Sequence, residues 1–275
     1  MKTVKLLPLF VLLLCIIACT KNGNNPNSVN AVSADDAADM VGSSLASNYN
    51  GLATVSDDIT NTGTSLTASS IASTHGSSFN SLNANLNTIA AAIDKKHLAC
   101  GLMITDTVSR HSSSNSALVT YSYNSIYNFT LNCNNSVPSD MTSILDYNGN
   151  FSGPVWLLVD TGITNFTVTG LSPQATDFVL NGEYKRQGSF HSKIDTTKHG
   201  NRTVDIVVTG LTLLKPARTI VSGTATISVT GYTPKKGKFT FDGTLVFKSD
   251  DTANLTINGT VYSINLVTGV KLKKG

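Results

Sequence analysis

Residues 119–133 read VTYSYNSIYNFTLNC, and the alternation in this stretch decides the fold. Apolar and aromatic side chains recur at every second position except Ser125, while hydroxyl and amide side chains fill most positions between them. A period of two is that of a β-strand with one buried face and one solvated face. Because such a strand is longer than most, the stretch predicts either an elongated, curved sheet or a bulge near Asn124 and Ser125.

The same alternation returns later in the chain, at residues 221–229 and again at residues 239–247. Asn258-Gly259 is typical of a two-residue type I′ hairpin. The cross-strand pairs that this hairpin predicts are Ile257 with Thr260, Leu255 with Tyr262, and Ala253 with Ile264. A second hairpin is expected at Asn148-Gly149, and a loop between two strands at residues 234–237. These patterns together predict about nine to eleven strands, mostly consecutive and antiparallel.

The segment before this β-rich part has helical spacing instead. Ser33 and Asp36 have the spacing of a capping box, and a narrow apolar stripe follows at residues 34–45. A second stripe occupies residues 79–93, and another helix is expected within residues 59–71. The stripes are thin, so these helices must pack against another part of the molecule.

These patterns predict an α+β fold in which N-terminal helices pack on a long, mostly antiparallel β-meander. The helical region covers residues 33–98 and the antiparallel β region covers residues 99–275, and the two are expected to form one domain. The alternative is an all-β sandwich or barrel with a helical N-terminal extension, in which the meander folds upon itself.

Residues 1–19 read MKTVKLLPLFVLLLCIIAC, in which two lysines precede an apolar run and a small residue precedes Cys19. This order is typical of a signal peptide, and the apolar run is too short for a retained membrane-spanning helix. Residues 16–19 resemble a bacterial lipobox, which implies that residues 1–18 are a lipoprotein signal peptide and that Cys19 is acylated, with palmitate as a typical chain. The other interpretation is an ordinary secretory signal in which Cys19 is incidental. Residues 19–32 are then the lipidated cysteine and a flexible polar tether.

The leader and the tether resemble those of outer-membrane lipoproteins from Bacteroidota-type bacteria, a resemblance that implies location and no particular activity. In such lipoproteins an acidic run soon after the cysteine directs export to the cell surface, and that run is absent here. Thr20 is also not the aspartate that retains some lipoproteins in the inner membrane. The resemblance therefore implies a protein on the periplasmic face of the bacterial outer membrane, held there by its lipid anchor.

Two of the four cysteines remain once Cys15 has left with the leader and Cys19 carries lipid. Two thiols in an oxidising compartment most simply pair, so a disulfide is expected between Cys100 and Cys133. The alternative, a redox or nucleophilic cysteine, lacks a CxxC spacing or a recognisable histidine and asparagine context.

Composition and motifs argue against several classes of protein. The formal net charge is +3, and two of the positive charges lie in the leader, which leaves too small an excess for binding nucleic acid. The common nucleophile, zinc and phosphate motifs are absent from the sequence, so neither catalytic residues nor a cofactor is expected. Asp146, Asn148 and Asn150 match the first three ligands of a calcium loop. Phe151 and Leu157 replace its required Gly and Glu, so no metal is expected either.

Aromatic side chains supply the one candidate ligand face. Its residues are Tyr121, Tyr123, Tyr127 and Phe129, which have the chemistry to stack on sugars or to line a lipid groove, although their regular alternation favours core packing. The densest polar cluster of the β region is Glu183, Tyr184 and Arg186 with His191, and it is interpreted as an ordinary outer strand face.

Three functions are compatible with these features. The first is a non-catalytic envelope lipoprotein, a structural or interaction module whose partner is an envelope protein or a lipid. The second is a carrier or binder of a lipid or another apolar ligand, because a long curved sheet with helices in its concavity resembles the architecture of periplasmic lipoprotein and lipid carriers. The third is a hydrolase without a recognisable motif. An internal apolar cavity would favour the second function, and a filled core would remove its basis.

Overall fold

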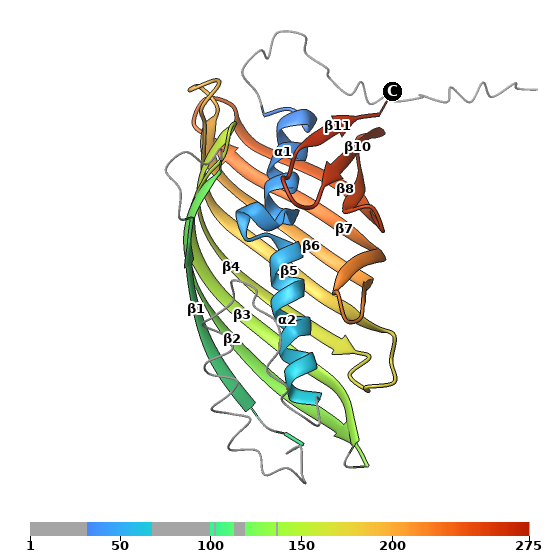
Figure 1. Cartoon of the computed structure of the whole chain (residues 1–275). Coiled ribbons are helices and arrows are strands. Elements are labelled where there is room, and N and C mark those ends of the chain that lie inside the picture. The colour runs from blue at the N-terminus through green and yellow to red at the C-terminus, as the bar shows by residue number, and fades with distance from the viewer. Residues whose placement is uncertain (1–31, 68–99, 102, 113–118, 136, 275) are drawn as a thin grey trace, which may run out of the picture.

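The computed structural model describes residues 32–67, 100, 101, 103–112, 119–135 and 137–274. These residues form one eleven-stranded sheet that curves around a helical segment lying along its concave side (Figure 1). The strands follow one another in chain order, each antiparallel to the next, as expected for strands joined by short turns. They are β1 Met103–His111, β2 Thr120–Asn134, β3 Val137–Ser152, β4 Trp156–Thr169, β5 Asp177–Ser192, β6 His199–Leu214, β7 Thr219–Thr233, β8 Gly237–Lys248, β9 Thr252–Ile257, β10 Thr260–Asn265 and β11 Lys271–Lys273.

This architecture corrects the predicted α+β fold. Strands make up 64% of the described residues and helices 14%, so the helices are a small addition to a sheet rather than a layer of equal weight. The alternative of a sandwich or barrel is also wrong, because all the strands in the described residues belong to a single open sheet with β1 and β11 at its edges. Eleven strands agree with the number that the alternation predicts.

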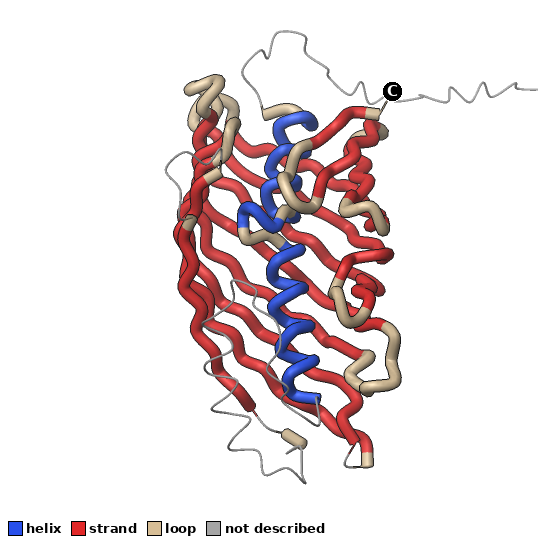
Figure 2. Tube along the Cα trace, viewed as in Figure 1, coloured by secondary structure: helices blue, strands red, loops and turns tan. Residues whose placement is uncertain are grey.

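The helical segment consists of α1 Ala34–Leu45, the short 3-10 helix η1 Ser47–Tyr49 and α2 Leu52–Thr67 (Figure 2). The predicted capping box is confirmed, since the Ser33 side chain accepts a hydrogen bond from the Asp36 amide and Asp36 accepts one from the Ser33 amide. Instead of a separate helix within residues 59–71, α2 begins earlier, at Leu52. The stripe at residues 79–93 lies outside the described residues.

The long strand predicted from residues 119–133 is β2, and it runs without a break through Asn124 and Ser125. The elongated, curved sheet is therefore the correct alternative. The one shift in register between β2 and β3 occurs at Asn132 and Cys133, close to the end of the strand.

One of the two predicted hairpins is confirmed and the other is wrong. The three pairs around Asn258-Gly259 form as predicted between β9 and β10, and residues 234–236 connect β7 to β8. The hairpin at Asn148-Gly149 is wrong, because both residues lie inside β3. Gly149 is there for packing, since a Cβ at this position would lie 2.6 Å from the Cβ of Tyr123.

The core lies between the concave face of the sheet and the helices. Apolar side chains of α1 and α2 are fully buried against inward side chains of the strands; they include Ala37, Ala38, Met40, Val41, Leu45, Leu52, Val55 and Ile59. The predicted disulfide is present between Cys100 and Cys133, whose Cα atoms are 5.5 Å apart. It joins the chain just before β1 to the end of β2, and so fixes one end of this edge pair.

Candidate binding site

The aromatic face expected to meet a ligand is part of the core. Tyr123, Tyr127 and Phe129 are buried on the concave side of β2, and Tyr121 is partly buried against them. The rings of Tyr127 and Phe129 stack with centroids 5.5 Å apart. These side chains therefore pack on the protein itself, as their regular alternation favours.

Asp58 of α2 organises the polar groups beside this aromatic face. Its carboxylate accepts two hydrogen bonds from Arg110 of β1, at 2.7 and 3.0 Å, and a third from the Tyr127 hydroxyl at 2.7 Å. Burial raises the pKa of Asp58, and the neighbouring Arg110 guanidinium opposes that shift. The two-point contact fixes α2 to the first two strands, because a guanidinium matches a carboxylate in both shape and charge.

A second buried cluster lies under the junction between α1 and α2. Arg186 of β5 donates a hydrogen bond to the Ser43 carbonyl at 3.0 Å and to the Tyr49 carbonyl at 3.4 Å. Carbonyls at the end of a helix lack intrahelical partners and carry its negative dipole, so a buried guanidinium stabilises them. Asp160 of β4 lies 3.0 Å from Arg186 and 3.1 Å from Arg202 of β6, so that one carboxylate separates two arginines.

The polar residues of β5 that lie close together in the sequence are on two different faces of the sheet. Tyr184 and Arg186 point into the core, whereas Glu183 and His191 lie on the outer face. In the part of the chain that the structure describes, no group of three or more His, Cys, Asp or Glu side chains is arranged to hold a metal ion. Cys19 lies outside the described residues.

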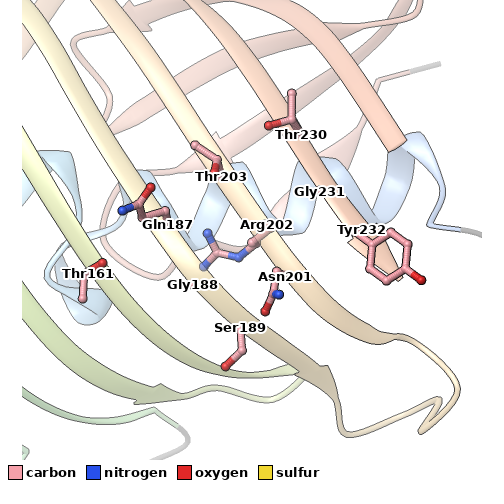
Figure 3. Close-up of a pocket in the computed structure, with 10 residues that line it drawn as sticks. All are labelled: Thr161, Gln187, Gly188, Ser189, Asn201, Arg202, Thr203, Thr230, Gly231 and Tyr232. Atoms are coloured by element: carbon pink, nitrogen blue, oxygen red, sulfur yellow. The ribbon is translucent and has the colours of Figure 1, made fainter. Parts of the chain in front are cut away.

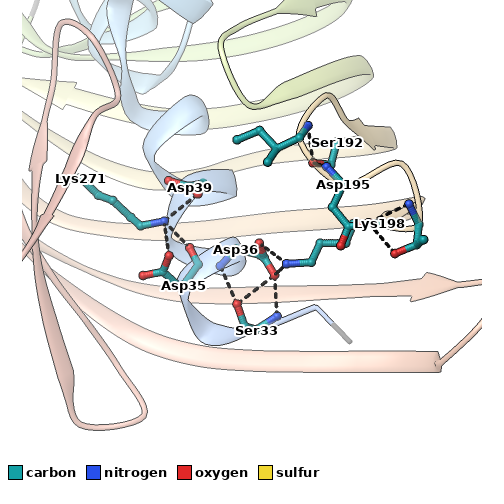
Figure 4. Close-up of polar contacts among 10 residues, drawn as sticks. Ser33, Asp35, Asp36, Asp39, Ser192, Asp195, Lys198 and Lys271 are labelled. Atoms are coloured by element: carbon teal, nitrogen blue, oxygen red, sulfur yellow. Dashed lines mark hydrogen bonds and ion pairs between the residues drawn. The ribbon is translucent and has the colours of Figure 1, made fainter. Parts of the chain in front are cut away.

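The carboxylates of α1 and α2 all pair with basic residues of the sheet or its loops, and neither helix contains a lysine or an arginine. Figure 4 shows the pairs of α1, in which Lys271 contacts both Asp35 and Asp39, and Lys198 contacts Asp36. In α2, Asp57 lies 2.6 Å from Arg218, and Asp58 contacts Arg110 as described above. Both apolar packing and ion pairs thus hold α1 and α2 on the concave side of the sheet.

Three neighbouring hollows lie on the convex face of the described strands. The central hollow, of about 460 Å³, lies over β4–β7 (Figure 3), and its lining residues are Thr161, Gln187, Gly188, Ser189, Asn201, Arg202, Thr203, Thr230, Gly231 and Tyr232. The Ile163 hollow, of about 540 Å³, lies on one side of it and shares Thr161 and Gln187. The Leu157 hollow, of about 430 Å³, lies on the other side and shares Ser189, Asn201 and Tyr232. We call this series the convex groove, and its hollows are open to solvent rather than enclosed.

The register of the strands aligns polar side chains along the floor of the convex groove. Starting at Asn124 in β2, successive cross-strand partners on the outer face carry only amide or hydroxyl groups. This amide–hydroxyl row consists of Asn124, Asn148, Thr161, Gln187, Thr203, Thr230 and Thr240. The sequence signal for the row is the polar half of each alternation, but only the register aligns those residues across the strands.

Comparison of the chain with protein-family models, with curated proteins and with solved structures gives no match. Among the described residues, neither helix has the length and hydrophobicity needed to span a membrane.

Proposed function

We propose that this protein is a non-catalytic interaction module of a bacterial envelope, anchored to the outer membrane through acylated Cys19, that binds its partner with the convex face of the sheet. The observation that carries the proposal is the contrast between the two faces. The described part of the concave face is packed against α1 and α2, whereas the convex face is open to solvent and hollowed by the convex groove.

The same contrast argues against the carrier function. A carrier of an apolar ligand needs an apolar cavity inside the curved sheet. Here Tyr127 and Phe129, which would line such a cavity, are buried: Tyr127 donates a hydrogen bond to Asp58 of α2, and Phe129 stacks on the Tyr127 ring. We therefore place the binding surface on the outside of the sheet and propose no lipid cargo.

Photo-crosslinking in a bacterial host that acylates lipoproteins tests the proposal. A photoreactive amino acid replaces Ser189, which borders two hollows of the convex groove, in the full chain. The matched control carries it at Thr244 of β8, an exposed position on the same face outside the groove. We expect an adduct with an envelope component from Ser189 and none from Thr244.

A second variant, Cys19→Ser, tests the anchor in the same host. We expect it to leave the membrane fraction and to give less adduct from Ser189, because the lipid anchor holds the module at the membrane. Equal adducts from both photoreactive positions, or none from either, would overturn the proposed binding face. Membrane retention of Cys19→Ser would overturn the proposed anchor.

A further inference from the structure

The convex groove displays hydrogen-bonding side chains that other described residues leave unused. Asn148, Gln187, Ser189 and Asn201 line it, and none of their side chains hydrogen-bonds to another described residue. Amides offer both donors and acceptors, and hydroxyls do the same. The groove is therefore complementary to a ligand that itself carries many donors and acceptors.

The centre of the groove is uncharged. Its outer-face side chains are amides, hydroxyls and Tyr232, and the Arg202 guanidinium is fully buried beside Asp160. At one end, Lys185 lies 3.5 Å from Asp205 and 3.8 Å from Glu183, so its charge is balanced by two carboxylates. Asp146 lines the same end, and His191 and His199 line the other. A phosphate-rich or otherwise anionic ligand requires an excess of cations, which the central hollow does not supply.

The Ile163 hollow reaches Thr107 of the edge strand β1, whereas the central hollow lies on the face of the sheet. The strands beneath the central hollow, β4 to β7, are paired on both sides, so their backbone groups are engaged with neighbouring strands. An extended peptide is ordinarily recognised by backbone hydrogen bonds at a free strand edge. Here only side chains are available to the ligand, which favours a ligand whose own polar groups are dense and regularly spaced.

Apolar side chains are present at both ends of the groove. Leu157 and Val159 lie with the half-exposed Tyr232 at one end, and Ile126 and Ile163 lie at the other. Sugar rings combine polar edges with faces of C–H groups, and such faces pack on aliphatic and aromatic side chains. The mixture of free amides, hydroxyls and exposed apolar groups fits this combination.

We infer that the convex groove binds an uncharged oligosaccharide or polysaccharide chain. This inference rests on the proposed function and names the chemical class of its partner. A chain of several sugar units fits the continuous series of three hollows better than a single compact molecule does, because neighbouring hollows share their lining residues.

Binding to immobilised polysaccharides tests the inference. The full chain, purified in a detergent without a sugar head group, is measured against neutral dextran, mannan, xylan and β-glucan, with anionic alginate as the comparison. We expect at least one neutral polysaccharide to bind, and Gln187→Ala and Asn201→Ala to weaken that binding at least tenfold. Thr244→Ala, outside the groove, is the matched control and should bind as the wild type does. Binding should not change between about 0.05 and 0.5 M salt, since screening acts on charges.

Two results would overturn the inference: binding to none of the four neutral polysaccharides, or neutral binding that Gln187→Ala and Asn201→Ala leave unchanged. Binding to alginate alone, abolished by salt, would also overturn it and would indicate an anionic ligand. The crosslinking experiment separates the two levels of proposal. An adduct from Ser189 without polysaccharide binding would leave the proposed function in place and reject the sugar class, whereas the absence of both would reject both.

Discussion

The four arginines of the chain are all paired with aspartates. Arg110 and Arg218 fix α2 to the sheet and its loops, while Arg186 and Arg202 share Asp160 in the core. The Arg186 guanidinium also lies 4.4 Å from the centre of the Phe151 ring, which provides a cation–π contact. Removing one member of a buried ion pair leaves the other without compensation, so these residues are sensitive positions for stability.

Arg186→Leu is expected to lower the free energy of unfolding by about 3 to 5 kcal/mol, because the Ser43 and Tyr49 carbonyls lose their donor and Asp160 loses one of its two cations. Urea unfolding followed by circular dichroism measures the loss. The matched control is Lys185→Leu on the outer face of the same strand, for which a change of less than about 1 kcal/mol is expected. Equal losses in the two variants would contradict the stabilising role of Arg186.

Asp58 makes stability depend on pH in a defined direction. Burial raises its pKa in the folded state, so the contribution of this residue to stability is greatest below the pKa of an unfolded aspartate and is lost as pH rises through the folded pKa. The stability advantage of the wild type over Asp58→Asn should therefore shrink as pH rises from about 4 to 8. Urea midpoints across this range test the prediction, with Asp57→Asn as the control on the same helix. An advantage that grows with pH would show that the sign is wrong.

The helices depend on the sheet for their charge balance. Acidic residues occur in both α1 and α2, basic residues in neither, and their partners Lys198, Arg218 and Lys271 lie far along the chain. The edge pair β1 and β2 depends on a covalent link instead, since β1 has a hydrogen-bonded neighbour on one side and the disulfide lies where this pair ends. Ion pairs with residues distant in the chain thus help to hold the helices, whereas a disulfide helps to hold the edge strands β1 and β2.

Removal of the disulfide is expected to lower stability without changing the fold. The double variant Cys100→Ser, Cys133→Ser should lose about 3 to 4 kcal/mol in the chain-entropy account, and its melting temperature should fall by about 10 °C. Differential scanning calorimetry measures this shift, and reduction of the wild type with dithiothreitol should reproduce it. A melting temperature unaffected by either treatment would mean that the bond adds nothing to the stability of β1 and β2.

The assembled sheet is held together by one continuous core, which runs from Val108 in β1 to Ile264 in β10 and includes both helices. A core shared in this way favours a single cooperative unfolding transition. Fluorescence of Trp156, the only tryptophan, reports on the core beside Phe190, whereas circular dichroism reports on all strands. The two signals should give the same urea midpoint. Midpoints that differ by more than the fitting error would indicate that part of the sheet unfolds separately.

Local chemistry explains which features of this fold could be predicted from the sequence. The alternation in β2, the turn at Asn258-Gly259 and the capping box at Ser33 each depend on residues close together in the chain, and all three are confirmed. Asn148-Gly149 has the same local signal as Asn258-Gly259, but the packing of Tyr123 against Gly149 takes precedence over it. A turn propensity is therefore a preference that tertiary contacts can override.

The candidate site could be predicted only in part. Its outward amides and hydroxyls follow from the alternation of each strand, but the amide–hydroxyl row requires the register of several strand pairs at once. The aromatic face is buried, and periodicity alone identifies one side of a strand without saying what covers it. The contact of Arg186 with the end of α1 joins residues 143 positions apart, and no local pattern indicates it.

The position of α1 beside the last strands imposes an order on folding. The Ser47 amide donates to the Leu266 carbonyl at 2.9 Å, and Lys271 donates to the Asp35 carbonyl at 2.7 Å. During synthesis, the first helix therefore emerges long before the residues that complete its surroundings. Strand pairing can proceed hairpin by hairpin, since each strand pairs with its neighbours in sequence. α1 cannot complete its contacts until the C-terminal residues are present. A chain that lacks β11 would therefore retain most of its sheet but lose part of the surface on which α1 packs.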